Sequence, residues 1–220
     1  SVSGMRDQTS GTVILNGKPL SLEGDDGAAH ARDAGLAHVP EDRQRMGLVT
    51  TFSEWENAIL GYQNSPEYGA GALLDIGAAK KAAAAHIELF DVRPANINLK
   101  TSLFSGGNQQ KIVLAREMQR DPDVLVIGQP TRGVDIGAIE FIHKEIIKMR
   151  DEGKAILLVS VELDEIRSLA DRILVMFDGV IVGEADPAVA TEGELGLMMA
   201  GINNKAAPRG LGIAEQGPLP

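Results

Sequence analysis

The second half of the chain alternates apolar runs with amphipathic stretches, and this alternation restricts the possible fold more than any other feature. The runs Val124–Ile127 and Ile156–Val159 are apolar throughout, as in strands covered on both faces. Between them, residues 137–150 place Ile139 and Ile142 at helical spacing. Such alternation predicts an α/β fold with a parallel sheet. The expected elements are strands 123–127, 155–160 and 172–177 and helices 137–150 and 162–169.

Two dipeptides predict antiparallel hairpins beside the parallel sheet. Asn16-Gly17 and Asp178-Gly179 each follow an apolar run, and both positions of such a turn tolerate a positive φ. They add an antiparallel β portion to the fold. The rest of the first half predicts one buried strand and two helices, the first of which begins with a capping box formed by Ser53 and Glu56. These elements are expected at residues 36–39, 53–61 and 78–90, and a last short helix at about 191–200.

Composition and charge exclude several classes of protein. The 220 residues carry 21 basic and 31 acidic side chains, a net charge of −10, so a nucleic-acid partner is not expected. There is no cysteine, which excludes disulfides. No apolar run approaches the roughly 20 residues needed to span a bilayer. We predict one globular domain over residues 1–201 and a disordered Gly/Pro/Ala-rich tail over 202–220.

A Ser-Gly-Gly sequence at the start of an amphipathic run is the strongest candidate for a binding site. Leu103–Gln110 reads LFSGGNQQ, and Ser105 is the predicted N-cap of the helix that follows. Gly106 and Gly107 lack Cβ atoms, so their backbone N–H groups can approach an anion, and the helix dipole favours negative charge there. Asn108 and Gln109 add amide donors for ribose or phosphate oxygens. An ordinary loop and helix cap would explain the same residues.

Together with its neighbours, this sequence resembles the ATP-binding cassette (ABC) family, the ATPase subunits of membrane transporters. LFSGGNQQK resembles the family's signature motif, and QPTRGVDIGA (Gln129–Ala138) resembles the segment that follows its second acidic strand. The resemblance extends from about Thr9 to Gly201. It is greatest to the second cassette of tandem ATPases that energise importers of nucleosides or simple sugars. It implies a P-loop NTPase-type core, with a helical subdomain at about 50–120 that carries the signature helix.

The resemblance also implies ATP and Mg²⁺ as ligands, and it shows which of the family's groups this chain lacks. No G-x-x-x-x-G-K-[ST] phosphate loop is present, and the family pattern places the missing P-loop strand just before Ser1. We expect the complete cassette, rather than this chain alone, to hold most of the nucleotide and its metal. The four histidines, His30, His38, His86 and His143, lack metal-ligand spacing, so no metal site is predicted within the chain.

Four further positions differ from the family pattern, and three of them, Gly128, Gln129 and Val161, predict a degenerate ATP site. Gly128 and Gln129 stand where the family has an aspartate and then the catalytic glutamate. Val161 stands where the family usually places a histidine that senses the γ-phosphate, and a valine side chain has no donor. Glu41, within VPEDR, replaces a glutamine and could reach a metal or a transmembrane partner, or could be a solvated loop acid.

The groups that remain are those that act on the opposite cassette. In the family, the signature motif of one cassette completes the ATP site of the other, so Ser105, Gly106, Gly107, Asn108, Gln109 and Asp135 are expected nucleotide-binding residues. Glu41 is a further expected nucleotide-binding residue. Asp135 is also a predicted N-cap. The implied partners are the other cassette, transmembrane permease subunits and, indirectly, a periplasmic or lipoprotein solute-binding protein. The implied location is the cytoplasmic face of the membrane.

Three alternatives stay open at this stage. The chain could belong to a regulatory pseudo-ATPase that binds a partner without transport. It could also be a conventional ATPase in which Gln129 suffices for catalysis. Finally, a chain that lacks its central P-loop strand could be an incomplete fold with unpaired strand edges. Trp55 likewise has two interpretations, an interface anchor for the permease or a core residue.

Overall fold

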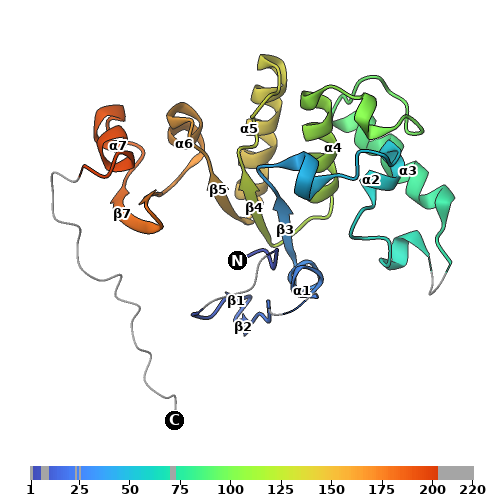
Figure 1. Ribbon diagram of the computed structural model, residues 1–220, viewed down its shortest axis with the longest axis horizontal. Helices are drawn as coiled ribbons and strands as arrows, with labels where there is room; N and C mark the ends of the chain where they lie inside the picture. The colour runs from blue at the N-terminus through green and yellow to red at the C-terminus, as the bar shows by residue number, and fades with distance from the viewer. Residues whose placement is uncertain (1, 6–9, 23, 25, 70–72, 203–220) are drawn as a thin grey trace, which may run out of the picture. The chain divides into compact units, whose positions relative to one another are not determined.

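The computed structural model describes residues 2–5, 10–22, 24, 26–69 and 73–202. The chain divides into two compact units, Ser1–Ser160 and Val161–Pro220. The predicted tail beyond residue 202 lies outside the described residues. The centre of the first unit is a parallel sheet in the order β3 (Leu36–Val39), β4 (Val124–Gly128) and β5 (Ala155–Val159), whose strands lie side by side in Figure 1. The predicted α/β architecture is confirmed.

The two faces of this sheet are not equally covered on every strand. Val39 on β3 and Leu125 and Ile127 on β4 are fully buried, as their apolar runs predict. On β5, however, Leu157 and Val159 are 47% and 56% exposed. The expectation that Ile156–Val159 is covered on both faces is therefore wrong. The exposed residues Ala155, Leu157 and Val159 alternate along the strand, so they share one face, and that face is the one the described residues leave uncovered.

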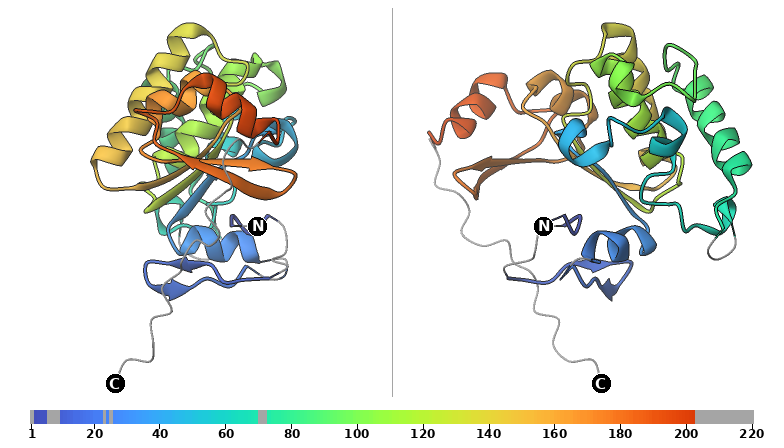
Figure 2. Two further views of the ribbon diagram at one scale, coloured as in Figure 1. Left: turned by 90° about the vertical axis from the view of Figure 1, so that its left-hand side faces the viewer. Right: turned by 45° about the vertical axis from the view of Figure 1, so that its right-hand side comes forward.

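A helical group accounts for most of the remaining core of the first unit. It consists of α2 (Glu54–Ala58), α3 (Ile76–Leu89) and α4 (Gly106–Met118), which pack together in Figure 2. From Gln109 to Met118 every residue of α4 is buried. The capping box of Ser53 and Glu56 is present, and Ser53 N donates to Glu56 Oε2 at 2.8 Å. Helix α2 ends at Ala58, three residues earlier than the sequence predicts.

The other elements of the first unit lie along the chain before, between and after the strands of the parallel sheet and the helices of the helical group. The hairpin predicted at Asn16-Gly17 joins β1 (Ile14–Leu15) to β2 (Lys18–Pro19), and both turn residues have positive φ. Asn16 Nδ2 donates to Asp123 Oδ2 at 2.8 Å, which ties the turn to the start of β4. The remaining helical elements are α1 (Gly27–Asp33), the π-helix η1 (Arg43–Gly47), the 3₁₀ turns η2 (Pro66–Tyr68) and η3 (Thr101–Leu103), and α5 (Ile136–Asp151).

The second unit is built on the other predicted hairpin. Strands β6 (Ile173–Phe177) and β7 (Val180–Ala185) are antiparallel, and Asp178 and Gly179 turn between them with φ of 47° and 77°. Helices α6 (Leu163–Leu169) and α7 (Glu192–Met199) complete the unit. Across the described residues of both units, no helix combines the length and the hydropathy that a membrane span requires.

Candidate functional site

The hydroxyl group of Ser105 caps the first turn of α4 as a hydrogen-bond acceptor. Its Oγ accepts from the backbone N–H of Asn108 at 3.4 Å and from Asn108 Nδ2 at 2.9 Å, so the predicted N-cap is confirmed. A serine hydroxyl has two acceptor lone pairs and one hydrogen to donate. Because both lone pairs are engaged, the hydrogen of this exposed hydroxyl is what it can offer to solvent or a ligand.

The two glycines that follow Ser105 present their backbone N–H groups at the same place. These N–H groups are N1 and N2 of α4, which have no partner within a helix, and no hydrogen bond of the described residues uses them. A Cβ at Gly106 would lie 2.5 Å from Arg43 Nη2, and one at Gly107 would lie 3.3 Å from Gly133 O. A side chain at Gly106 would therefore have to displace the end of the Arg43 side chain, and one at Gly107 would press on the backbone at Gly133.

The amide side chains of Asn108 and Gln109 are used within the protein. Asn108 Oδ1 accepts from Arg93 N at 2.7 Å, while its Nδ2 holds Ser105. Gln109 is 3% exposed; its Nε2 donates to Thr101 O and Phe104 O at 3.0 and 3.3 Å, and its Oε1 accepts from Gln44 at 3.0 Å. These contacts favour a positioning role for both amides.

The segment after β4 lies against the start of α4. Gln129 is buried and adopts a φ of 49°, and its backbone N donates to Val159 O at 2.8 Å. Asp135 is the N-cap of α5, as predicted, because its Oδ1 accepts from Ala138 N at 2.9 Å. This backbone hydrogen bond lowers the pKa of Asp135 below its usual value. The side chain is exposed, so it can cap the helix and still face a ligand.

Gly128 and Glu41 form a close contact between β4 and the segment that follows β3. A Cβ at Gly128 would lie 3.2 Å from Glu41 N, so a larger residue would require this segment to move by a few tenths of an ångström. The Glu41 carboxylate is exposed and pairs with Arg132 Nη1 at 2.8 Å. The structure therefore places Glu41 beside the end of β4, but with its charge already paired.

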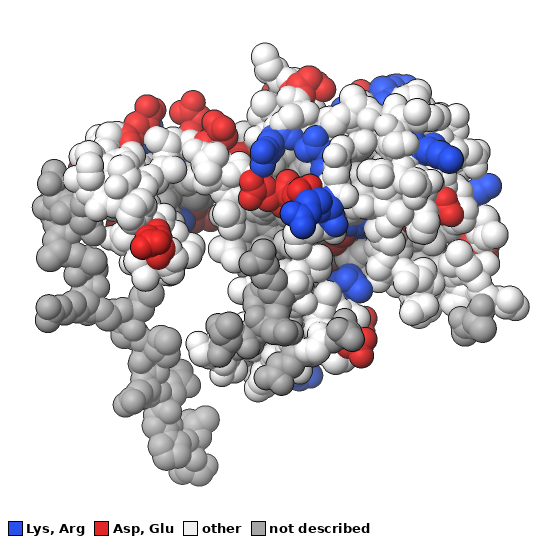
Figure 3. Space-filling model, in the orientation of Figure 1, with Lys and Arg blue, Asp and Glu red and all other residues white. Residues whose placement is uncertain are grey.

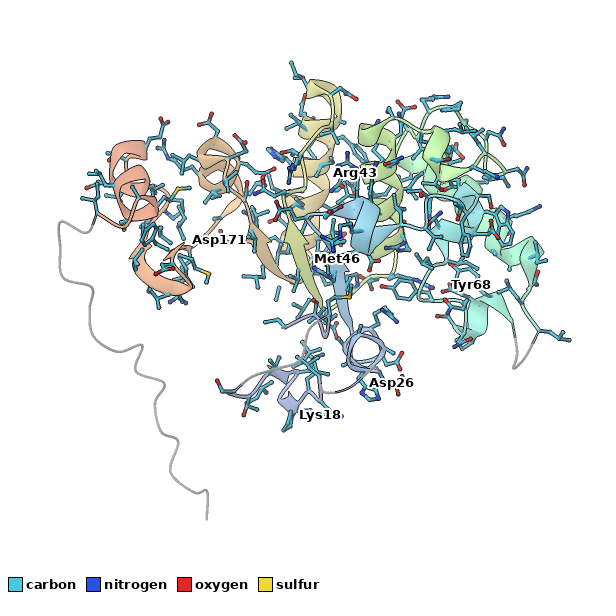
Figure 4. The ribbon with its side chains drawn as sticks, viewed as in Figure 1. Lys18, Asp26, Arg43, Met46, Tyr68 and Asp171 are labelled. Carbon is cyan, nitrogen blue, oxygen red and sulfur yellow. The ribbon has the colours of Figure 1, made fainter. Side chains whose placement is uncertain are left out.

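Arg43 and Arg132 lie at this site, and sequence reasoning missed both. Arg43 Nη1 donates to Arg132 O at 3.1 Å, and its Nη2 lies over Gly106. Figure 4 labels Arg43 on the segment after β3. Partial burial, with a smaller contribution from Arg132, lowers the pKa of Arg43. Figure 3 shows basic and acidic side chains interleaved near the middle of this face. The sequence gives no signal for this pair, because three separate segments must pack together to create it.

The other candidate residues lie away from this site or have structural roles. Burial lowers the pKa of His38, and it lowers that of His86 to about 4. Within the described part of the chain, no three acidic or histidine side chains are arranged to hold a metal ion. Trp55 is half-buried against the cluster of Ile59, Tyr68 and Ala79, and Lys80 Nζ lies 5.6 Å from its ring centroid.

Comparison with known proteins agrees with this geometry. A family model described as ABC transporter matches residues 1–132. The guanosine import ATP-binding protein NupO of Bacillus subtilis (strain 168) is 44% identical over 211 residues, which are 96% of this chain and 41% of that protein. The nucleoside import ATP-binding protein NupA of Lactococcus lactis subsp. cremoris (strain MG1363) is 43% identical over 202 residues, which are 92% of this chain and 39% of that protein. The chain thus spans about two fifths of these curated relatives.

Solved structures agree with the same assignment at the level of the fold. The dimeric structure of MJ0796, described as a bacterial ABC transporter cassette, superposes with a TM-score of 0.69. The superposition covers 84% of this chain and 77% of that one, at 22% sequence identity. The predicted P-loop NTPase-type core is therefore confirmed as a fold. Because the family model covers more than half of its residues, this chain belongs to the ABC transporter family. It has the fold of that family's ATP-binding cassettes.

Proposed function

We propose that this chain is the second nucleotide-binding cassette of a tandem ATPase that energises an importer of nucleosides or simple sugars. Relatives that match over more than nine tenths of the chain are named for guanosine and nucleoside import, and a further one for glucose import, which supports this class of solute. In this proposal the signature residues Ser105, Gly106 and Gly107 complete the ATP site of the other cassette. That cassette, the permease subunits and, indirectly, a solute-binding protein are the partners, at the cytoplasmic face of the membrane.

The observation that carries the proposal is the convergence of three unused donors at the start of α4. The hydroxyl of Ser105 can only donate outward, and the N–H groups of Gly106 and Gly107 have no partner among the described residues. Helix N-termini of this kind favour phosphate groups. A Cβ at either glycine would also meet close neighbours, the end of the Arg43 side chain at Gly106 and backbone atoms at Gly107. These residues fit the γ-phosphate of ATP, with Asp135 beside them and the amides of Asn108 and Gln109 holding the turn.

We further infer that the chain's own ATP site is degenerate. Gly128 offers no oxygen to a Mg²⁺-bound water, and Gln129 cannot accept a proton as a carboxylate does. Glu41 is paired with Arg132, and Val161 is exposed without a polar group. Mg²⁺ and most of the nucleotide would then be held by the complete cassette. When bound, the metal would neutralise charge on the phosphates; the donors at the start of α4 would serve the nucleotide of the other cassette.

Replacing Ser105 with alanine tests the proposed role of the signature residues. In the full-length ATPase assembled with its permease, we expect Ser105→Ala to lower steady-state ATP hydrolysis roughly 10- to 100-fold, because a hydrogen bond to a charged group contributes about 1.5–3 kcal/mol. The matched control is Ser102→Ala, an exposed serine in η3, which should leave the rate unchanged. Equal rates for Ser105→Ala and the wild type would exclude the proposal. ATP binding by the full-length protein without hydrolysis would favour the regulatory pseudo-ATPase instead.

A glycine at position 129 tests whether Gln129 takes part in hydrolysis. Glycine accepts the φ of 49° without strain, so Gln129→Gly removes the side chain while keeping the backbone conformation. If this site is degenerate, steady-state hydrolysis by the assembled transporter should stay within about twofold of the wild-type rate. A loss of tenfold or more would mean that Gln129 orients the attacking water and that the chain is a conventional ATPase. Thermal unfolding of the variant controls for misfolding.

A further inference from the structure

The guanidinium group of Arg43 lies directly beside the donors at the start of α4. Its Nη2 occupies the space that a side chain at Gly106 would need, and it lies 3.5 Å from the position of a Cβ at Gly133. Its Nη1 donates to Arg132 O at 3.1 Å, which fixes the plane of the guanidinium. Arg43 begins η1, directly after the strand β3 and the segment of Glu41, so a third segment of the chain contributes to this surface.

Burial lowers the pKa of Arg43 and the neighbouring Asp42 opposes this lowering, but among the described residues no carboxylate is paired with the Arg43 guanidinium. Within the described residues its hydrogen bond is to a backbone carbonyl, and no ion pair involves it. Its Nε is buried and has no partner. The nearby Arg132 is itself a cation, and its charge is already paired with Glu41. Besides burial, the charge of Arg132 still contributes to lowering the pKa of Arg43, so an anion bound beside Nη2 would stabilise the charged guanidinium.

We propose that Arg43 is an additional phosphate ligand at this site, where it contacts the terminal phosphate of the nucleotide that Ser105, Gly106 and Gly107 bind. The inference rests on the proposed function, because it takes the same nucleoside triphosphate as the ligand. A guanidinium can donate two parallel hydrogen bonds to phosphate oxygens. Arg43 thereby adds a full positive charge to a cradle that otherwise offers only neutral donors, and it favours a triphosphate over a diphosphate.

The test compares the affinities for a non-hydrolysable ATP analogue and for ADP in the full-length ATPase. We expect Arg43→Gln to weaken binding of the analogue roughly tenfold or more and to leave ADP binding unchanged, because a charged hydrogen bond of about 1.5–3 kcal/mol is lost only with the γ-phosphate. Arg43→Lys should recover part of the loss, since it keeps the charge without the planar fork. The control is Arg45→Gln, an exposed arginine of the same short helix, which should bind both nucleotides as the wild type does.

A purely structural role for Arg43 predicts a different result. If Arg43→Gln weakens both nucleotides equally, or lowers the unfolding temperature without changing the ratio of the two affinities, the inference is overturned. Ser105→Ala in the same assay separates this inference from the proposed function. If only Ser105→Ala changes the ratio of the two affinities, the proposed function stands and the role of Arg43 is wrong. If neither variant changes the ratio, both proposals fail. If only Arg43→Gln changes the ratio, Arg43 contacts the phosphate and the role of Ser105 is wrong.

Discussion

Replacing Glu54 with glutamine is expected to stabilise the chain at pH 8 by about 4 kcal/mol and to leave its stability at pH 5 nearly unchanged. Glu54 is fully buried in α2, and neither carboxylate oxygen has a hydrogen-bond partner. Burial raises its pKa from the usual 4.5 to about 8. The native state therefore keeps this proton over a pH range in which the unfolded chain has lost it. The stability that depends on protonated Glu54 is fully present below pH 4.5 and is lost as the pH rises to about 8.

Urea unfolding of the 220-residue chain at pH 5 and pH 8 measures this effect. The matched control is Glu56→Gln on the same helix. The hydrogen bonds from Ser53 lower the pKa of Glu56, so the contribution of Glu56 to stability is lost only in acid. Glu56→Gln should therefore keep the wild-type difference in the free energy of unfolding between pH 5 and pH 8. If Glu54→Gln shows the same pH dependence as the wild type, Glu54 is not the proton-binding group. A single cooperative transition would also argue against an incomplete fold.

Replacing Arg116 with methionine is expected to destabilise the chain by about 3–5 kcal/mol at pH 7. Arg116 and Glu117 on α4 form an ion pair of 2.7 Å, and both are about 4% exposed. Arg116 Nη1 also donates to Gly47 O and Asn57 O, which joins α4 to η1 and α2. In the variant, the buried Glu117 carboxylate keeps only a neutral donor, the hydroxyl of Tyr62. The carbonyls of Gly47 and Asn57 also lose their donor.

The double variant Arg116→Met/Glu117→Gln isolates the cost of the unpaired charge. It should recover at least half of the stability lost in the single variant, because the buried anion is gone and Tyr62 can still donate to the amide oxygen. Arg45→Met removes an exposed arginine and should change the free energy of unfolding by less than about 0.5 kcal/mol. Equal losses in the single and double variants would mean that packing, rather than the buried charge, sets the cost.

The sequence predicted the regular elements well where local signals determine them. Both hairpins, the capping box of Ser53 and Glu56 and the N-caps Ser105 and Asp135 are present, because each depends on residues close together in the chain. The exposed face of β5 was not predicted. An apolar run indicates a strand, but burial of its faces depends on segments elsewhere in the chain that pack on them.

The same distinction applies to the candidate site. Ser105, Gly106 and Gly107 were identified from the sequence, since a helix start that binds anions has a local pattern. The use of Gln109 inside the domain and the position of Arg43 over Gly106 were not, because they depend on contacts between segments more than 60 residues apart. Glu54 and Arg116 are charged residues in amphipathic helices, and nothing in their spacing indicates that they are buried.

The contact between Gly128 and the segment of Glu41 couples the residue at the end of β4 to the segment that follows β3. A Cβ at position 128 would lie 3.2 Å from Glu41 N, so alanine or any larger residue has to move that segment by a few tenths of an ångström. Glu41 is paired with Arg132 of the segment after β4, so the movement would also be felt at this ion pair. The size of the residue at position 128 and the geometry of the Glu41–Arg132 pair therefore cannot be changed independently.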